Sequence, residues 1–234
     1  MKKRNILLAR QSVGWGSRVA AVAGKDMVCE FRTRYAFNAI VLFALVTLTA
    51  VSFSVGALYP SEEIMAAIFW IILFFASMSG LAHTFVKEEE SGTAMILRLS
   101  ADGMVIFWGK LIFNFILVTA ITVLIVPLFV IFLDVSIGNW VIFAAGLVLG
   151  LIGLSGATTI VAAIVSRASV KGALFTVLSF PVLMPLLMAG IEITKVGFIG
   201  GGWSEVSAPL QLLAAYDVVM ITISVLLFDF VWRA

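Results

Sequence analysis

Long apolar runs, separated by short polar segments, follow one another along most of the 234-residue chain. A helix that crosses the hydrocarbon core of a bilayer needs about 20 predominantly apolar residues. Runs of this length predict six spans, over residues 37–58, 64–86, 105–133, 140–165, 172–191 and 210–231. The pattern therefore predicts an all-α integral membrane protein whose residues 37–234 form a single six-helix transmembrane domain.

The Lys and Arg residues indicate which way these spans cross the membrane. Eight of the fifteen precede the first span, and all the others except Lys195 lie in or beside segments 87–104 and 166–171 or near the C-terminus. With six spans, all of these segments lie on the same side of the membrane. Because loops rich in Lys and Arg stay in the cytoplasm, we expect both termini to be cytoplasmic.

Residues 1–36, which precede the first span, divide into two predicted parts. Residues 1–17 form a basic tail, and its apolar run 6–9 is shorter than the core of a signal peptide, so we expect a cytosolic tail without cleavage. In residues 18–36, apolar side chains recur at near-helical spacing: Ala20, Ala23, Met27, Phe31 and Tyr35. This pattern predicts an interfacial amphipathic helix lying in the lipid head groups, and a loose basic tail is the alternative.

The cytoplasmic segment 87–104 begins with three consecutive carboxylates: Glu88, Glu89 and Glu90. Residues 93–100 (TAMILRLS) can then form about two helical turns that carry three large apolar side chains: Met95, Ile96 and Leu99. A helix this short is not stable alone and has to pack against something. Apolar side chains on a short cytosolic helix predict a docking site for a soluble partner, and a solvated hairpin loop is the alternative.

The amino-acid composition indicates a membrane protein and excludes several kinds of functional site. The chain is 62% hydrophobic and 12% charged, whereas a soluble domain has about 25% charged residues. One Cys and one His exclude a disulfide framework, a Cys/His zinc site and a c-type haem attachment motif. No catalytic set and no metal site emerge. The stretch GMVIFWGK lacks the spacing of a phosphate-binding loop, so any ATP used here is bound by another chain.

Two carboxylates near or inside the spans are candidate functional groups. Asp217 lies about seven residues into the sixth predicted span. An intramembrane carboxylate is by default a functional candidate, and a hydrogen-bonded helix contact is the alternative. Glu192 lies at the outer end of the fifth span, beside a glycine-rich outer loop.

Helix-breaking and small residues mark the fourth and fifth spans. Pro181 and Pro185 each remove a backbone donor, so the fifth helix should kink, either as a hinge or as part of its packing. Gly146, Gly150 and Gly153 let a neighbouring helix approach the fourth span closely.

Four segments of the chain resemble one known family. They are KDMVCEFRTRYAFNAIVLFAL, GLAHTFVKEEESGTAMILRLSADGMVIFWGK, PLLMAGIEITK and LAAYDVVMITISVLLFDFVWR. From about residue 25 to the C-terminus the chain is similar to the B subunits of the haem exporter of bacterial cytochrome c maturation (the CcmB family). These proteins are ABC transporter permeases with the architecture of ABC-2-type exporters.

The resemblance implies a multi-pass permease of the bacterial inner membrane that has no ATPase activity. Residues 93–100 would be a coupling helix in a groove of a separate ATP-binding subunit. Glu88, Glu89 and Glu90 would face the basic rim of that groove or lengthen the second span into the cytosol.

The resemblance also implies partners. Two copies of the chain would assemble on two ATP-binding subunits, with a haem-handling membrane subunit, a small helper protein and a haem chaperone, and without nucleic acid. ATP hydrolysis would drive haem export or release of the haem-loaded chaperone, and this chain would bind no cofactor of its own. The alternatives are the same fold exporting a glycan or a lipid, and a non-conducting scaffold for haem-handling proteins.

Overall fold

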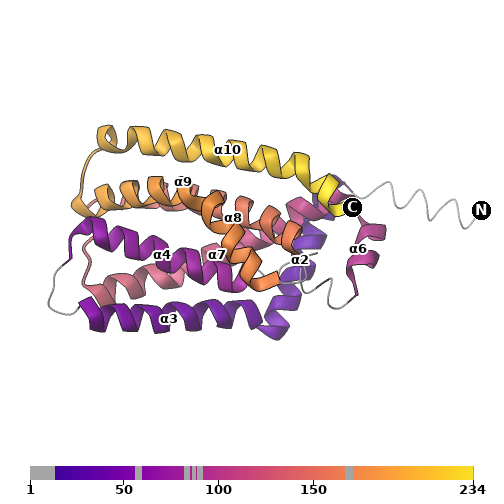
Figure 1. The fold of residues 1–234 in the computed structure, drawn as a ribbon, viewed down its shortest axis with the longest axis horizontal. Coiled ribbons are helices and arrows are strands. Elements are labelled where there is room, and N and C mark those ends of the chain that lie inside the picture. Colours follow the sequence, from indigo (N-terminus) through magenta and orange to yellow (C-terminus); the bar gives the residue numbers. More distant parts are fainter. Residues whose placement is uncertain are drawn as a thin grey trace, which may run out of the picture.

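The structure, a computed structural model, describes residues 14–55, 60–81, 85, 88, 92–166 and 171–233. The elements in these residues are α-helices, drawn in Figure 1: α2 (Trp15–Thr33), α3 (Tyr35–Val55), α4 (Glu62–Leu81), α6 (Ala94–Ser100), α7 (Gly103–Leu133), α8 (Trp140–Val165), α9 (Lys171–Ile199) and α10 (Trp203–Arg233). Six of them, α3, α4 and α7 to α10, are long and apolar enough to cross a membrane. The predicted all-α architecture with six spans is therefore confirmed.

The largest difference from the predicted spans is the turn between the last two helices. The sequence predicts a loop over 192–209, but α9 continues to Ile199 and α10 begins at Trp203. Gly200 makes the turn with φ +85°, in the left-handed region that glycine adopts without strain. The prediction was too short because it followed hydropathy, whereas polar residues such as Glu192 and Lys195 continue a helix when they pair with each other, here at 2.7 Å.

The helices α3 and α10 lie along opposite edges of the bundle in Figure 1, and α8 is the most deeply enclosed span. Glycines of α8 allow close approach of its neighbours. An added Cβ would lie 2.5 Å from Ile193 at Gly146 and 2.1 Å from Trp70 at Gly150. The Trp70 indole also donates to Thr194 Oγ1 at 2.8 Å, so this ring joins α4 to both α8 and α9.

The fifth span, α9, is one continuous helix that contains Pro181 and Pro185. In Figure 1 its ribbon changes direction along its length, as expected for a helix in which two residues lack a backbone N–H. Whether this bend acts as a hinge stays a prediction.

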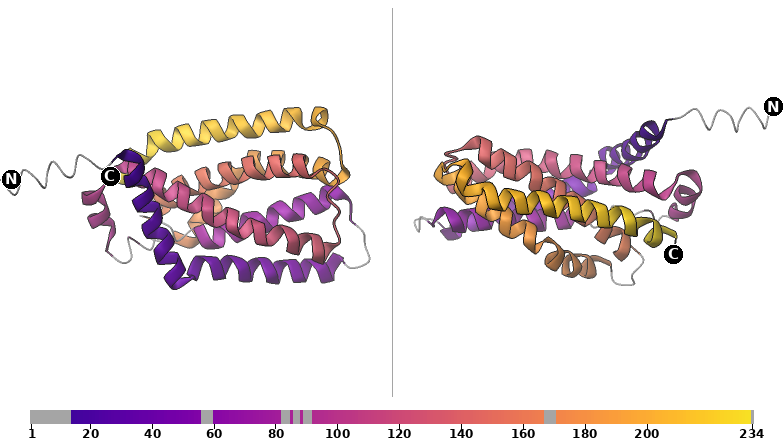
Figure 2. Two further views of the ribbon diagram at one scale, coloured as in Figure 1. Left: turned by 180° about the vertical axis from the view of Figure 1, so that it is seen from behind. Right: turned by 90° about the horizontal axis from the view of Figure 1, so that it is seen from above.

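The helix α2 lies across the end of the bundle, at a steep angle to α3 (Figure 2). Arg34, with φ 51°, separates the two helices, and its N–H donates to the Glu30 carbonyl. The buried face of α2 contains Val19 and Val22, whereas Phe31, predicted on the apolar face, is 71% exposed. Gly109 of α7 explains the choice of face, because a Cβ there would lie 2.6 Å from Val22, so only glycine leaves room for this side chain.

Candidate functional site

The short helix α6 lies beyond the spans, at the end of the bundle where α2 and the end of α10 also lie (Figures 1 and 2). Its first turn is held by Thr93, whose N–H and hydroxyl both donate to the carbonyl of Glu88, at 3.0 and 3.4 Å. Its last turn is held by Ser100, whose hydroxyl donates to the Leu97 carbonyl at 2.9 Å. Leu97 also packs against the core, which supplies the tertiary contact that a helix of seven residues needs.

The outward face of α6 is apolar. Met95 is 70% exposed, Ile96 67% and Leu99 74%, and all three precede the first turn of α7. We call these three side chains the α6 surface. Such a group of exposed large apolar side chains outside the spans is typical of a protein–protein contact.

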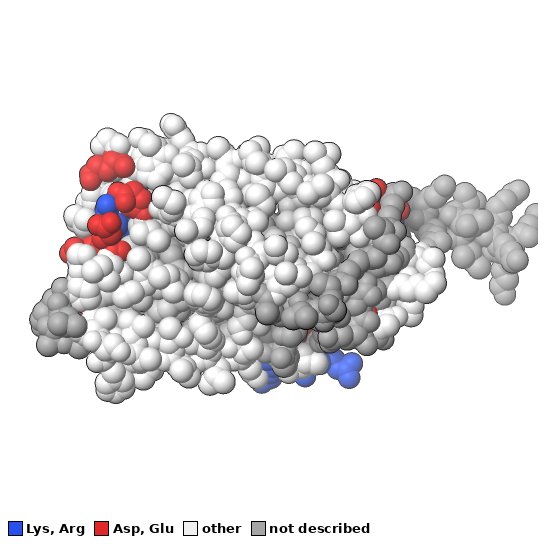
Figure 3. Space-filling model, viewed as in Figure 1, with Lys and Arg blue, Asp and Glu red and all other residues white. Residues whose placement is uncertain are grey.

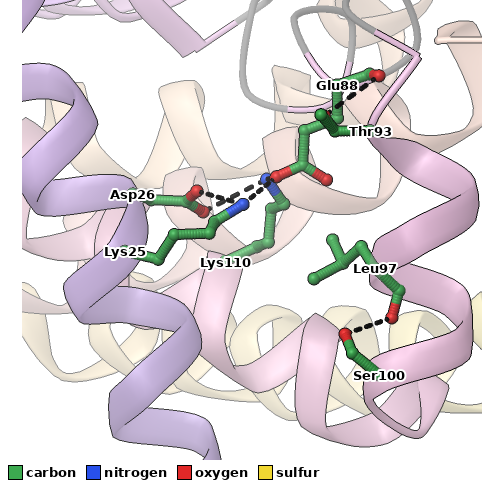
Figure 4. Close-up of polar contacts among 7 residues, drawn as sticks. All are labelled: Lys25, Asp26, Glu88, Thr93, Leu97, Ser100 and Lys110. Carbon is green, nitrogen blue, oxygen red and sulfur yellow. Dashed lines mark hydrogen bonds and ion pairs between the residues drawn. The ribbon is translucent and has the colours of Figure 1, made fainter.

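Behind α6 lies a group of charged side chains, the ion-pair cluster: Lys25, Asp26, Glu88 and Lys110 (Figure 4). The ammonium group of Lys110 lies 2.8 Å from Glu88 Oε1 and 3.1 Å from Asp26 Oδ2. The ammonium group of Lys25 contacts the same Glu88 oxygen and lies 3.0 Å from Asp26 Oδ1. Two cations and two carboxylates therefore neutralise one another at the end of the bundle.

The buried side chains of this cluster stay charged because they are paired. Lys110 is 1% exposed and Glu88 7%. Burial alone would raise the pKa of Glu88, but Lys110 and Lys25 outweigh it and hold that pKa below its usual value. Burial alone would lower the pKa of Lys25, but Asp26 and Glu88 hold it above its usual value. Both groups are therefore charged at neutral pH.

The cluster connects three separate elements. Lys25 and Asp26 belong to α2 and Lys110 belongs to α7, while Glu88 contacts the N-cap residue of α6 through its main chain. Lys110 also lies 5.0 Å from the centroid of the Phe85 ring, a cation–π contact. The cluster therefore joins α2, the start of α6 and α7.

The structure shows where the Glu88 carboxylate lies. Glu88, Glu89 and Glu90 were predicted to face the basic rim of a partner or to lengthen the second span into the cytosol. The carboxylate of Glu88 points inward to the buried ammonium group of Lys110, and a role of Glu88 toward a partner stays a prediction. Glu89 and Glu90 lie outside the described residues. Sequence reasoning also missed the role of Lys110. The available signal was a lysine inside an apolar run, because such a residue needs a carboxylate partner.

An open depression of about 620 Å³ lies beside α6, between the start of α7 and the end of α10. It is lined by Asp102, Asp229 and apolar side chains that include Met104, Leu226 and Trp232. Asp102 also pairs with Arg18 of α2 at 3.0 Å, so the depression adjoins the start of α2.

The other predicted candidates lie away from α6. Asp217 is 5% exposed and lies in the middle of α10, against Gly153 of α8. Glu192 pairs with Lys195 at the opposite end of the bundle, where Figure 3 shows acidic side chains gathered around a small basic patch. Within the part of the chain that the structure describes, no group of three or more His, Cys, Asp or Glu side chains could hold a metal ion.

Comparison with known proteins adds two findings to this geometry. The model of the CcmB protein family matches residues 17–231, nearly the whole chain. A relative from Rhodobacter capsulatus, heme exporter protein B, is 27% identical over 199 residues, which cover 83% of this chain and 88% of the relative.

Proposed function

The chain belongs to the CcmB family and is a multi-pass protein of the bacterial inner membrane, and from this premise we propose that it is the permease subunit of an ABC exporter that acts in cytochrome c maturation. A separate subunit binds and hydrolyses ATP, and the complex exports haem or releases a haem-loaded chaperone. The name of the relative from Rhodobacter capsulatus supports haem as the ligand.

The α6 surface is the single observation that carries the proposal of a soluble ATP-binding partner. Met95, Ile96 and Leu99 are each at least two-thirds exposed on a helix outside the spans. Covering a side chain of this size contributes about 1.5–3 kcal/mol. A groove of the ATP-binding subunit that encloses all three side chains would therefore bind α6 tightly, so that a movement of that subunit would move α6 with it.

The ion-pair cluster supports the proposal that this movement reaches the spans. The carbonyl of Glu88 accepts from the first turn of α6, and the carboxylate of the same residue holds Lys110 of α7. A force applied to α6 by the partner is in this way passed to the first turns of α7 and to α2. On this proposal α6 lies in the cytoplasm, as do both termini.

The composition of the complex follows from the same proposal. Six spans are half of the usual transmembrane complement of an ABC transporter, so two copies of the chain pair on two ATP-binding subunits. A haem-handling membrane subunit, a small helper protein and a haem chaperone complete the assembly.

The test is co-purification of a tagged chain from membranes in mild detergent. The double variant M95D/L99D places carboxylates on the α6 surface and leaves Leu97, which anchors α6, unchanged. The matched control M95L/L99M keeps the surface apolar and of nearly equal volume. We expect an ATP-binding subunit to co-purify with the wild type and the control, and to be lost from M95D/L99D.

Cytochrome c maturation is the second measurement, read as covalently bound haem in the cells. We expect M95D/L99D to insert at the wild-type level and to lose maturation. If this variant keeps both the ATP-binding subunit and maturation, the chain is not coupled through α6, and a passive scaffold for haem-handling proteins explains it better.

A further inference from the structure

The carboxyl group of Asp217 is buried in the interior of the spans. Asp217 is 5% exposed, and neither of its oxygens has a hydrogen-bond partner among the described residues. The hydroxyl of the adjacent Tyr216 is engaged elsewhere, because it donates to the Val182 carbonyl at 3.0 Å. Several buried hydroxyls, such as that of Ser155, also have no partner among the described residues, but a hydroxyl carries no charge, so Asp217 stands out as an ionisable group with both oxygens unpartnered.

The missing side chain of Gly153 makes the space for this carboxyl. A Cβ on Gly153 would lie 2.3 Å from Oδ1 of Asp217, 2.6 Å from Leu186 of α9 and 3.2 Å from the ring of Tyr216. The carboxyl group is thus enclosed by the backbone of α8, an apolar side chain of α9 and an aromatic ring of its own helix.

Among the residues that the structure describes, the charged and titratable groups on the elements around Asp217 offer no counter-charge. Tyr216 is the adjacent titratable group on α10, and its hydroxyl is engaged by the Val182 carbonyl of α9. Gly153 is the neighbour on α8 and Leu186 the neighbour on α9. The helix α7, which also packs against α10, carries Lys110, but its ammonium group is engaged by Glu88 and Asp26.

An ionised carboxylate enclosed in this way is unfavourable, and a buried acid without a counter-charge becomes neutral by binding a proton. A metal ion would need several further oxygen ligands, whereas the position that a Cβ on Gly153 would occupy beside Oδ1 is bordered by carbon atoms of Leu186 and Tyr216. The ligand that this site accommodates is therefore a proton.

We propose that Asp217 is a proton-binding site inside the membrane, neutral while α10 packs against Gly153 and ionised when α10 moves away from α8. The neutral form is tolerated in the packed arrangement, where the carboxyl has apolar neighbours. The ionised form disfavours that arrangement, because the carboxylate has no counter-charge there among the described residues. Raising the pH therefore shifts the protein toward the separated arrangement. This proposal concerns α8 and α10 of this chain and goes beyond the function proposed above.

The test measures how closely α8 and α10 pack as a function of pH. Gly156 lies on α8 one turn beyond Gly153, and a Cβ there would lie 3.6 Å from Ile221 Cγ1 of α10, an ordinary contact. The double variant G156C/I221C places two cysteines on facing positions of α8 and α10, so that a disulfide between them reports how closely the two helices pack. Cys29, the one natural cysteine, is exposed and is replaced by serine.

The yield of the disulfide is measured in membranes with a mild oxidant, with Asp217 in place and with D217N. Asparagine keeps the shape of aspartate but cannot ionise. Both proteins carry the same two thiols, so the effect of pH on thiol reactivity is the same in both and does not contribute to the difference between them. We expect the yield with Asp217 to fall, relative to D217N, by several-fold as the pH rises from mildly acidic to alkaline.

Two outcomes would overturn the proposal. Identical pH profiles with Asp217 and with D217N would mean that no proton on this carboxyl controls the packing. A yield that rises with pH relative to D217N would mean that the ionised form is the packed one. Neither result depends on whether an ATP-binding subunit is present, so the test is independent of the function proposed above.

Discussion

The ion-pair cluster and the Asp217 site both bury carboxyl groups, but they satisfy them in different ways. In the cluster, Glu88 and Asp26 share two ammonium groups, and the carboxylates stay charged. At Asp217, the neighbours are a glycine, an aliphatic side chain and a tyrosine that is bonded elsewhere. Burial alone therefore does not decide whether a carboxyl group is charged, because its neighbouring groups determine whether the ionised form is stabilised.

Their positions in the bundle match this difference. The cluster lies where α2, α6 and α7 meet, outside most of the span length, so it can hold elements together by charge. Asp217 lies in the middle of α10, where the same charge would have no counter-ion.

The largest effect is expected from Lys110→Met. It removes the most buried cation of the cluster and leaves two carboxylates sharing Lys25. Breaking a buried ion pair on one side costs about 3–5 kcal/mol, so the free energy of unfolding should fall by that amount, measured by thermal unfolding in detergent. The double variant E88M/K110M removes both charges and should recover part of the loss. An unchanged melting temperature for K110M would show that the cluster contributes little.

A smaller effect is expected from Gly153→Ala. The new methyl group would meet both Asp217 Oδ1 and Leu186, and overpacking of a tight contact costs about 1–3 kcal/mol. The matched control is Gly156→Ala, where the added Cβ meets only Ile221, at 3.6 Å, so no loss of stability is expected. Equal loss in the two variants would mean that the close approach at Asp217 is unimportant.

The smallest effect is expected from acidification of the wild type. Because the pKa of Glu88 is lowered in the folded protein, its stabilising contribution is complete above the ordinary value of 4.5 and disappears as the pH falls through the lower folded value. The melting temperature should therefore decrease on acidification below that value. The variant E88Q should show a smaller decrease, and equal decreases would assign the acid sensitivity to other groups.

The sequence alone was sufficient for the architecture, because long apolar runs mark membrane spans directly. The helix α6 was also predictable, since its apolar residues stand between a glycine and an Ala-Asp-Gly turn. The ion-pair cluster was not, because Glu88 is 22 positions from Lys110 and 63 from Lys25. Pairing over such separations depends on how α2 packs on α7, and that packing depends on Gly109, which has no distinctive sequence pattern.

The residues of the Asp217 site could be predicted from the sequence, but the contact between them could not. A carboxylate inside an apolar run is visible in the sequence, and the small residues of α8 are visible as well. The contact between Asp217 and Gly153 required the crossing of α8 and α10, which depends on the shapes of many side chains together. For the same reason the fifth and sixth spans were predicted too short, since helix continuation past the apolar run depends on local pairs such as Glu192 with Lys195.

The glycine turns at the end of the bundle opposite α6 have a mechanical consequence. Gly138 donates to the Phe198 carbonyl at 3.1 Å, Asn139 donates to the Gly197 carbonyl at 2.8 Å, and the Asn139 side chain donates to Gly201. These bonds fasten the start of α8 to the end of α9 and to the turn into α10. The helices therefore share a pivot at that end, and a small rotation about it grows with distance along the spans. The displacement would be greatest at the ends of the helices farthest from these turns, where α6 lies.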